Sequence, residues 1–187
     1  MSREEGLPAT LKAVVSAEQI EHRVAELARQ ITHDYAGKRL FVIGVLENAF
    51  VFMADLIRQL ELPTVCQFVL SDVRDIEHGL APSREIFFFP EVEVTGEHVL
   101  LIEGLVQSGL TTDFLVTNVM GRGAASVKTA ALLDRQGARK VSLQPDYWGF
   151  QIEADYVVGY GLGAPHLGRN LPYVAATGAP APVSKEP

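Results

Sequence analysis

The sequence has a single cysteine, no long hydrophobic run and no excess of positive charge. Cys66 is the one cysteine among 187 residues, which excludes an internal disulfide, and its place in the apolar run VCQFVL predicts a small buried thiol without a chemical role. No apolar stretch approaches the roughly 20 residues that cross a membrane, so no membrane partner is expected. The first residues, MSREEGLPATLK, lack the apolar segment of a secretory signal, which favours a cytoplasmic protein. A formal net charge of -7 argues against binding to nucleic acid, because phosphate backbones attract positive patches.

The chain is long enough for one well-buried core and short for two full domains, so a single domain is expected. Both ends are rich in proline, small and charged residues. We therefore expect residues 1–10 and 178–187 to be disordered and the domain to span residues 11–177.

Helical and strand patterns alternate along the chain. Ser16 and Gln19 form a capping box that predicts a helix ending near Gly37. Asn48 is a candidate N-cap for a second helix, and a third is expected over roughly 112–121. Continuous apolar runs, typical of strands buried on both faces, occupy residues 39–46, 64–70, 98–104 and 126–134. The sequence therefore predicts an α/β fold in which a mainly parallel sheet is flanked by helices on both faces.

The same patterns predict which side chains face the core. The residues at helical spacing are Ile20, Val24, Leu27, Ile31 and Tyr35 in the first helix, Phe50, Met53, Ala54, Ile57 and Leu60 in the second, and Phe114, Leu115 and Val119 in the third. The polar stretch over residues 71–85 is long for a plain connection and predicts either a functional flap or a disordered loop.

The segment from Val99 to Thr112 has the composition of a phosphate site. It runs from a buried strand through a turn into a helix, and Gly104 and Gly109 permit backbone angles that let successive N–H groups converge on an anion. The hydroxyl donors are Ser108, Thr111 and Thr112. A helix N-terminus adds about 0.3–1 kcal/mol of favourable interaction for an anionic group. On composition alone, these residues also fit a plain helix cap.

The run EGLVQSGLT at residues 103–111 resembles the phosphoribosyl pyrophosphate motif of the type I phosphoribosyltransferases. The runs GKRLFVIGVL, RGAASVKTAALLD, PDYWGFQIEADYVVGYGL and GRNLPYV follow in matching order, so residues 20–174 resemble the hypoxanthine-guanine branch. The resemblance implies a parallel sheet with flanking helices and a small hood, formed by the N-terminal segment and about residues 144–177. It also implies a homodimer or tetramer.

The resemblance assigns roles to individual residues. The loop that grips the 5'-phosphate would consist of Gln107, Ser108, Gly109, Leu110 and Thr111. Lys128 matches the lysine that reads the 6-oxo group of the purine, although a lysine in an apolar strand also reaches solvent by extending its stem. Tyr147 matches the aromatic that stacks on the base and Trp148 the residue whose backbone meets the base edge, although such a pair equally serves packing. On the pyrophosphate side the matches are Leu46, Glu47, Asn48 and Arg169, the last of which is otherwise an ordinary solvated charge.

Several residues depart from the family pattern at the places where the chemistry occurs. The family has two adjacent acids for the ribose diol, but here Glu103 is followed by Gly104. Gln107 replaces the aspartate assigned to the proton transfer, and a neutral amide is no general base near neutral pH. Glu47 places a negative charge toward the pyrophosphate side, where two like charges at about 4 Å repel by roughly 4 kcal/mol at an effective dielectric near 20.

Further departures affect the metal and the lid. Gly163 stands where the family has an aspartate near magnesium and the base, and the loop residues 71–73, Ser-Asp-Val, lack the tyrosine of the family lid. We therefore expect no metal ligands, with Mg²⁺ required only if the protein is active.

Three hypotheses follow. The first is a hypoxanthine-guanine phosphoribosyltransferase-like protein that binds a purine nucleotide or a 5'-phosphate, with catalysis lost or strongly impaired. The second is an active purine-salvage enzyme that makes IMP and GMP from hypoxanthine, guanine and phosphoribosyl pyrophosphate. The third is either a structural or partner-binding role without a nucleotide or a different reaction in a remodelled pocket.

Overall fold

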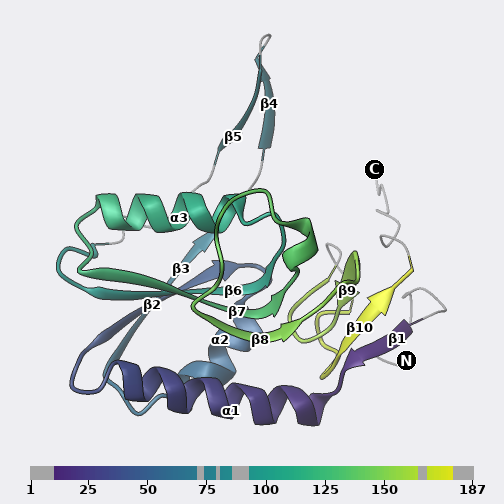
Figure 1. Cartoon of the computed structure of the whole chain (residues 1–187), viewed down its shortest axis with the longest axis horizontal. Coiled ribbons are helices and arrows are strands. Elements are labelled where there is room, and N and C mark those ends of the chain that lie inside the picture. Colours follow the sequence, from purple (N-terminus) through teal and green to yellow (C-terminus); the bar gives the residue numbers. More distant parts are fainter. Residues whose placement is uncertain (1–10, 71–73, 79–80, 86–92, 164–167, 179–187) are drawn as a thin grey trace.

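The computed structural model describes residues 11–70, 74–78, 81–85, 93–163 and 168–178, and its centre is a five-stranded parallel sheet (Figure 1). The strands, in spatial order, are β3 (Thr64–Leu70), β2 (Leu40–Leu46), β6 (His98–Val106), β7 (Ser126–Asp134) and β8 (Tyr147–Gln151). Each neighbouring pair runs parallel. The four apolar runs predicted as strands are β2, β3, β6 and β7, so the predicted fold class is confirmed.

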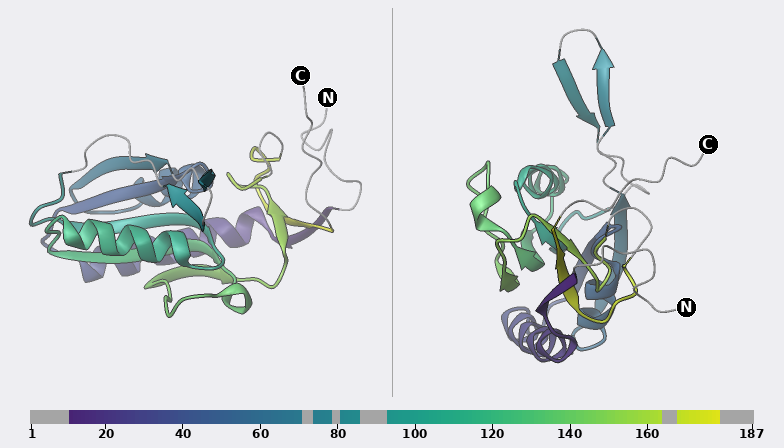
Figure 2. Two further views of the ribbon diagram at one scale, coloured as in Figure 1. Left: turned by 90° about the horizontal axis from the view of Figure 1, so that it is seen from above. Right: turned by 90° about the vertical axis from the view of Figure 1, so that its right-hand side faces the viewer.

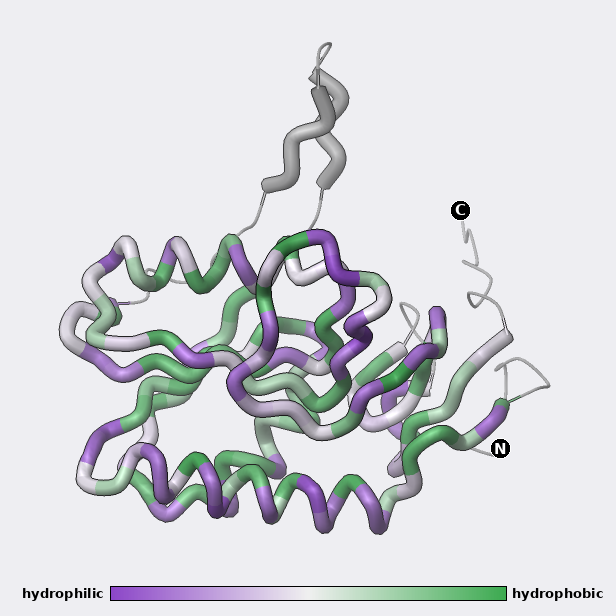
Figure 3. Tube along the Cα trace, in the orientation of Figure 1, coloured by the Kyte–Doolittle hydropathy of each residue, from purple (hydrophilic) through white to green (hydrophobic). Residues whose placement is uncertain are grey.

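Helices cover both faces of this sheet (Figure 2). Helices α1 (Ala17–Asp34) and α2 (Phe50–Ile57) lie on one face, and α3 (Leu110–Gly121) lies on the other. Two apolar clusters fill the two interfaces, one beneath α1 and α2 and the other beneath α3. The strands are accordingly mainly hydrophobic, whereas hydrophobic and hydrophilic residues alternate along α1 (Figure 3).

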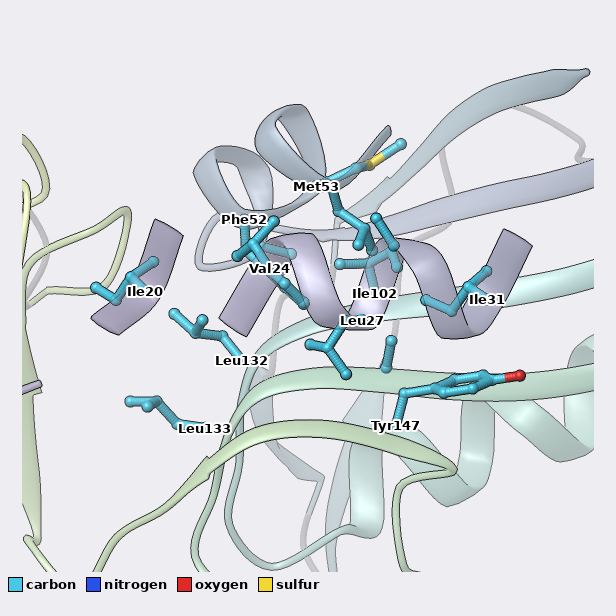
Figure 4. Close-up of a cluster of buried hydrophobic side chains, with 14 of the residues drawn as sticks. Ile20, Val24, Leu27, Ile31, Phe52, Met53, Ile102, Leu132, Leu133 and Tyr147 are labelled. Atoms are coloured by element: carbon cyan, nitrogen blue, oxygen red, sulfur yellow. The ribbon is translucent and has the colours of Figure 1, made fainter. Parts of the chain in front are cut away.

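Helix α1 shows how the sequence specifies its own boundaries. The Ser16 hydroxyl accepts a hydrogen bond from the Gln19 N–H at 3.2 Å, and the Gln19 side chain accepts one from the Ser16 N–H at 2.8 Å. This reciprocal pair confirms the predicted capping box. The four core positions predicted within α1 and the fifth, Tyr35, directly after it are all buried. Figure 4 shows Ile20, Val24, Leu27 and Ile31 among side chains of α2 and the sheet.

A second, smaller sheet lies beyond the carboxyl ends of the parallel strands (Figure 1). Its antiparallel strands are β1 (Leu11–Val15), β10 (Val174–Thr177) and β9 (Tyr156–Val158), in that spatial order. The segment 144–177, expected as part of a hood, is divided between the two sheets, since β8 pairs with β7. The small sheet therefore consists of the N-terminal strand and two strands from the later part of that segment.

A hairpin extends from the body of the chain (Figure 1). Strands β4 (Arg74–His78) and β5 (Ala81–Glu85) pair antiparallel, so most of the polar stretch 71–85 forms strands. The expected lid residues 71–73 lie outside the described residues, as do both chain ends except Gly178. A short 3-10 turn (Gln136–Ala138) follows β7.

Several local predictions were wrong. Cys66 is exposed rather than buried, because β3 forms an edge of the sheet. Asn48 is not the N-cap of α2: the helix begins at Phe50, and Ala49 precedes it without a side-chain cap. The buried face of α2 is also rotated from the predicted one and consists of Phe52, Met53 and Leu56, while Phe50 is 43% exposed. Phe114, expected to point inward, is 46% exposed. None of the described helices is long and apolar enough to cross a membrane.

Candidate phosphate and nucleotide site

The loop between β6 and α3 has the backbone of an anion site. Gly109 is the N-cap of α3 and has a φ of 78°, a conformation that glycine adopts without strain. A Cβ at this position would lie 3.0 Å from the Cδ of Arg139, so the Arg139 side chain packs closely against the loop. No side chain caps α3, and the Ser108 hydroxyl makes only a long contact of 3.4 Å with the Leu110 N–H. The helix therefore presents its positive N-terminal end at the loop, as an anion requires.

The Glu103 side chain reaches from β6 to the first turn of α3. Its side chain is buried, and the hydroxyl of Thr112, also buried, donates to it at 3.0 Å. Burial raises the pKa of the Glu103 carboxyl to about 7, and the hydrogen bond from Thr112 opposes part of that rise. At neutral pH a large fraction of this carboxyl is therefore protonated and uncharged.

Gly104 leaves no room for the second acid of the family pattern. A Cβ on Gly104 would lie 2.2 Å from the carbonyl oxygen of Asn48 and 2.9 Å from the Cδ2 of Leu162. Asn48 belongs to the turn that follows β2, in which the Leu46–Glu47 peptide bond is cis. The turn therefore occupies the space into which an acidic side chain would project.

Arg169 meets this same turn, so the structure brings together the residues predicted for the pyrophosphate side. Its guanidinium donates to the Asn48 side chain at 2.8 Å, to the Glu47 carboxylate at 2.8 Å and to the carbonyl of Gly161. The expected repulsion by Glu47 is thus offset by an ion pair, which is weak because the Glu47 side chain is 63% exposed. In this arrangement Arg169 is occupied by the protein itself.

The predicted purine-reading residues do not lie at this site. Lys128 in β7 is paired with Leu100 in β6. The pair Val106 and Asp134, at the carboxyl end of the same two strands, lies six residues further on, so Lys128 is about 20 Å from that end. Its ammonium donates to the Tyr147 hydroxyl at 3.1 Å, and that hydroxyl donates to Asp34 at the end of α1 at 2.7 Å. Lys128 and Tyr147 therefore link α1 to the sheet far from the loop. This agrees with a role in packing rather than in reading a purine.

Trp148 is likewise part of the main sheet. It pairs with Ala131 in β7, and its carbonyl accepts a hydrogen bond from the Arg23 guanidinium at 2.8 Å. The same guanidinium donates to the carbonyl of Gly149 at 3.2 Å. The backbone of Trp148 is thus engaged by α1, which leaves the predicted contact with a base edge without structural support.

Two features at the carboxyl edge were missed in the sequence. The Arg139 guanidinium donates to the carbonyl of Gln107 at 2.8 Å and pairs with the carboxylate of Asp134. Tyr156, which is 48% exposed, follows Asp155, whose carboxylate pairs with Arg135 directly after β7. The only sequence signal for either was its place after a strand end, where ligands of parallel sheets lie.

Among the described residues, no three His, Cys, Asp or Glu side chains come together as metal ligands. A magnesium ion held mainly by water and substrate phosphates needs fewer protein ligands than that. Gly163, at the position of the family aspartate, supplies no donor side chain. The Glu103 carboxyl, in β6 before the loop, is buried against Thr112.

Comparisons with known proteins agree with this architecture. The chain matches the phosphoribosyl transferase domain over residues 11–164. The hypoxanthine-guanine phosphoribosyltransferase of Bacillus subtilis is 36% identical over 165 residues, which cover 87% of this chain and 91% of that protein. The bifunctional protein TilS/HprT of Listeria innocua is also 36% identical over 165 residues, but this chain spans only 25% of its length. A crystal structure of a hypoxanthine-guanine phosphoribosyltransferase from Bacillus anthracis aligns with a TM-score of 0.77 at 36% identity, covering 89% of this chain and 98% of the other. The chain therefore belongs to the phosphoribosyl transferase family, and within it to the hypoxanthine-guanine branch.

Proposed function

We propose that this protein binds a purine nucleotide or another 5'-phosphate ester at the loop Gln107–Thr111, and that its phosphoribosyl transfer is lost or strongly impaired. The observation that carries the second part is the contact between Gly104 and the turn after β2, since the Asn48 carbonyl fills the place of an acidic side chain. The proposal therefore separates a retained phosphate site from a remodelled reaction site.

The phosphate side rests on neutral donors. Gly109 in its left-handed conformation, the hydroxyls of Ser108 and Thr111, and the N-terminus of α3 provide hydrogen bonds without a metal ion. Such a site suits a phosphate monoester. We therefore expect binding of GMP or IMP to be largely independent of Mg²⁺.

Three features of the reaction side support the proposed loss of transfer. Gln107 is a neutral amide and has no useful proton affinity, so it cannot serve as a general base. Glu103 is buried against Thr112, and Arg169 is held by Glu47 and Asn48 rather than free for a pyrophosphate. Loss of general acid–base catalysis alone lowers rates by about 10²–10⁴.

For the base we propose Tyr156 in place of Lys128 and Tyr147. It is an exposed aromatic side chain of the small sheet, and its neighbour Asp155 contacts the first residue after β7. An aromatic face stacks on any base with favourable energy, so this position fits a purine.

A transfer assay tests the proposal directly. Purified protein is incubated with phosphoribosyl pyrophosphate, Mg²⁺ and labelled hypoxanthine or guanine, alongside the Bacillus subtilis relative. We expect turnover at least about 100-fold slower than that of the relative. Calorimetry with GMP and IMP, with and without Mg²⁺, tests the retained site. Absence of binding by either nucleotide at millimolar concentration would refute the binding part.

The alternative function is an active purine phosphoribosyltransferase that makes IMP and GMP. It is favoured by 36% identity to hypoxanthine-guanine phosphoribosyltransferases over most of the chain. Turnover comparable with the relative's would establish this alternative and refute the loss of catalysis.

We also propose that the protein is cytoplasmic and forms a homodimer or tetramer. Phe68 and Leu70 support the assembly, because both lie on the edge strand β3 and are 43% and 38% exposed. Light scattering of the purified protein measures the mass of the particle, and a monomeric mass would contradict the assembly.

A further inference from the structure

Residues 139–141, which follow the 3-10 turn after β7, form a strap behind the phosphate loop. The Arg139 guanidinium donates to the carbonyl of Gln107 at 2.8 Å, and the Lys140 N–H donates to the carbonyl of Ser108 at 2.9 Å. A Cβ on Gly109 would lie 3.0 Å from the Arg139 Cδ and 3.0 Å from the Val141 Cγ2. The strap thus contacts three successive residues of the loop.

These contacts determine which way the loop's N–H groups point. In a planar trans peptide the C=O and the N–H lie on opposite sides of the chain. Since the strap holds the carbonyls of Gln107 and Ser108 on its own side, the N–H groups of Ser108 and Gly109 point away from it. Among the described residues, neither of these N–H groups has a hydrogen-bond acceptor. Two successive N–H groups that face the same way form a concave site for an anion.

Asp134 anchors the strap to the sheet. It is the last residue of β7, is 1% exposed, and pairs through one carboxylate oxygen with the Arg139 guanidinium. The Arg139 side chain is 14% exposed, so little water competes for its hydrogen bonds. A guanidinium reaches the carboxylate and the Gln107 carbonyl at the same time, whereas the single ammonium of lysine does not match both directions.

We propose that Arg139, anchored by Asp134, is a positioning residue that orients the phosphate loop for its ligand, a phosphate monoester. The proposal rests on the proposed phosphate site. Arg139 acts through the Gln107 carbonyl and does not itself touch the ligand. The competing interpretation is that Arg139 only neutralises the buried carboxylate of Asp134.

Calorimetry with ribose 5-phosphate tests this role, because that probe depends on the phosphate loop and not on a base pocket. We expect Arg139→Lys to weaken binding about tenfold while the protein stays folded, as judged by circular dichroism, because one hydrogen bond within a charge-assisted pair is lost. The matched control is Arg39→Lys, which alters an ion pair with Glu97 near the amino-terminal end of the sheet and should change the affinity less than about twofold.

A double variant separates positioning from neutralisation. Asp134→Asn together with Arg139→Met removes both charges and the hydrogen bond to Gln107, and we expect its affinity to remain at least about tenfold weaker than that of the unmodified protein. If this double variant, or Arg139→Lys, bound ribose 5-phosphate as tightly as the unmodified protein does, the proposal would be overturned. If the unmodified protein does not bind ribose 5-phosphate at millimolar concentration, then the phosphate site itself is wrong, which is a distinguishable outcome.

Discussion

Replacement of Glu103 by glutamine should stabilise the protein at neutral and alkaline pH but much less in acid. The folded protein holds this carboxyl with a pKa of about 7 rather than its ordinary value of 4.5, because the group is buried. Folding therefore favours the protonated form. The free energy of unfolding is therefore not reduced by this group below about pH 4.5. It falls as the pH rises toward 7, because the folded state must then accommodate a buried carboxylate.

The size of the effect follows from the two pKa values. Each pH unit between them corresponds to about 1.4 kcal/mol, so the full penalty is about 3 kcal/mol, most of which develops between pH 5 and pH 8. Glutamine has nearly the same shape, stays neutral, and its amide oxygen accepts the hydrogen bond from Thr112. Any constant cost of its extra N–H groups is the same at both pH values and cancels in the comparison.

Urea unfolding at pH 5, 6, 7 and 8 measures this prediction. The difference in unfolding free energy between Glu103→Gln and the unmodified protein should grow by about 2–3 kcal/mol across the series. Glu61→Gln, which changes an exposed carboxyl, is the control and should show no comparable trend. A difference that stays constant from pH 5 to pH 8 would show that Glu103 is ionised in the folded protein and would refute the reasoning.

Other changes test the neighbouring features. Gly104→Ala should destabilise the protein by about 1–3 kcal/mol because its Cβ meets the Asn48 carbonyl, whereas Gly121→Ala, in open space on α3, should stabilise it by about 0.4–1 kcal/mol; urea unfolding compares the two. Gly104→Asp combined with Gln107→Asp should restore little transfer in the radiolabel assay, and strong rescue would show that the turn yields easily. Lys128→Met should leave the calorimetric affinity for ribose 5-phosphate within about twofold, since the lysine lies about 20 Å from the loop; a larger loss would contradict that placement. Ser16→Ala should lower the free energy of unfolding by about 1 kcal/mol through loss of the capping box, and an unchanged denaturation midpoint would contradict this.

The fold could be predicted because its main signals are local. Continuous apolar runs specify strands that are covered on both faces, and the reciprocal bonds of Ser16 and Gln19 mark the start of a helix. Cys66 was misplaced because an apolar run does not say whether its strand becomes an edge. The face of α2 was misjudged because its residues are nearly all apolar, so helical spacing does not single out one side.

Of the candidate site, only the loop is marked by a local pattern in the sequence. The loop 107–111 is contiguous, whereas the contact between Arg169 and Glu47 joins residues 122 positions apart, and no local pattern indicates it. The distance of Lys128 from the loop follows from its place in its strand. It is the third residue of a nine-residue parallel strand, so its own position already put it at the end opposite to the ligand edge.

The close fit between Gly104 and the Asn48 carbonyl couples two segments that are far apart in the sequence. An aspartate codon is a single nucleotide away from a glycine codon, yet that change alone would push a side chain into the backbone of the turn. An acidic side chain at position 104 therefore requires a second change, one that moves the turn away from β6.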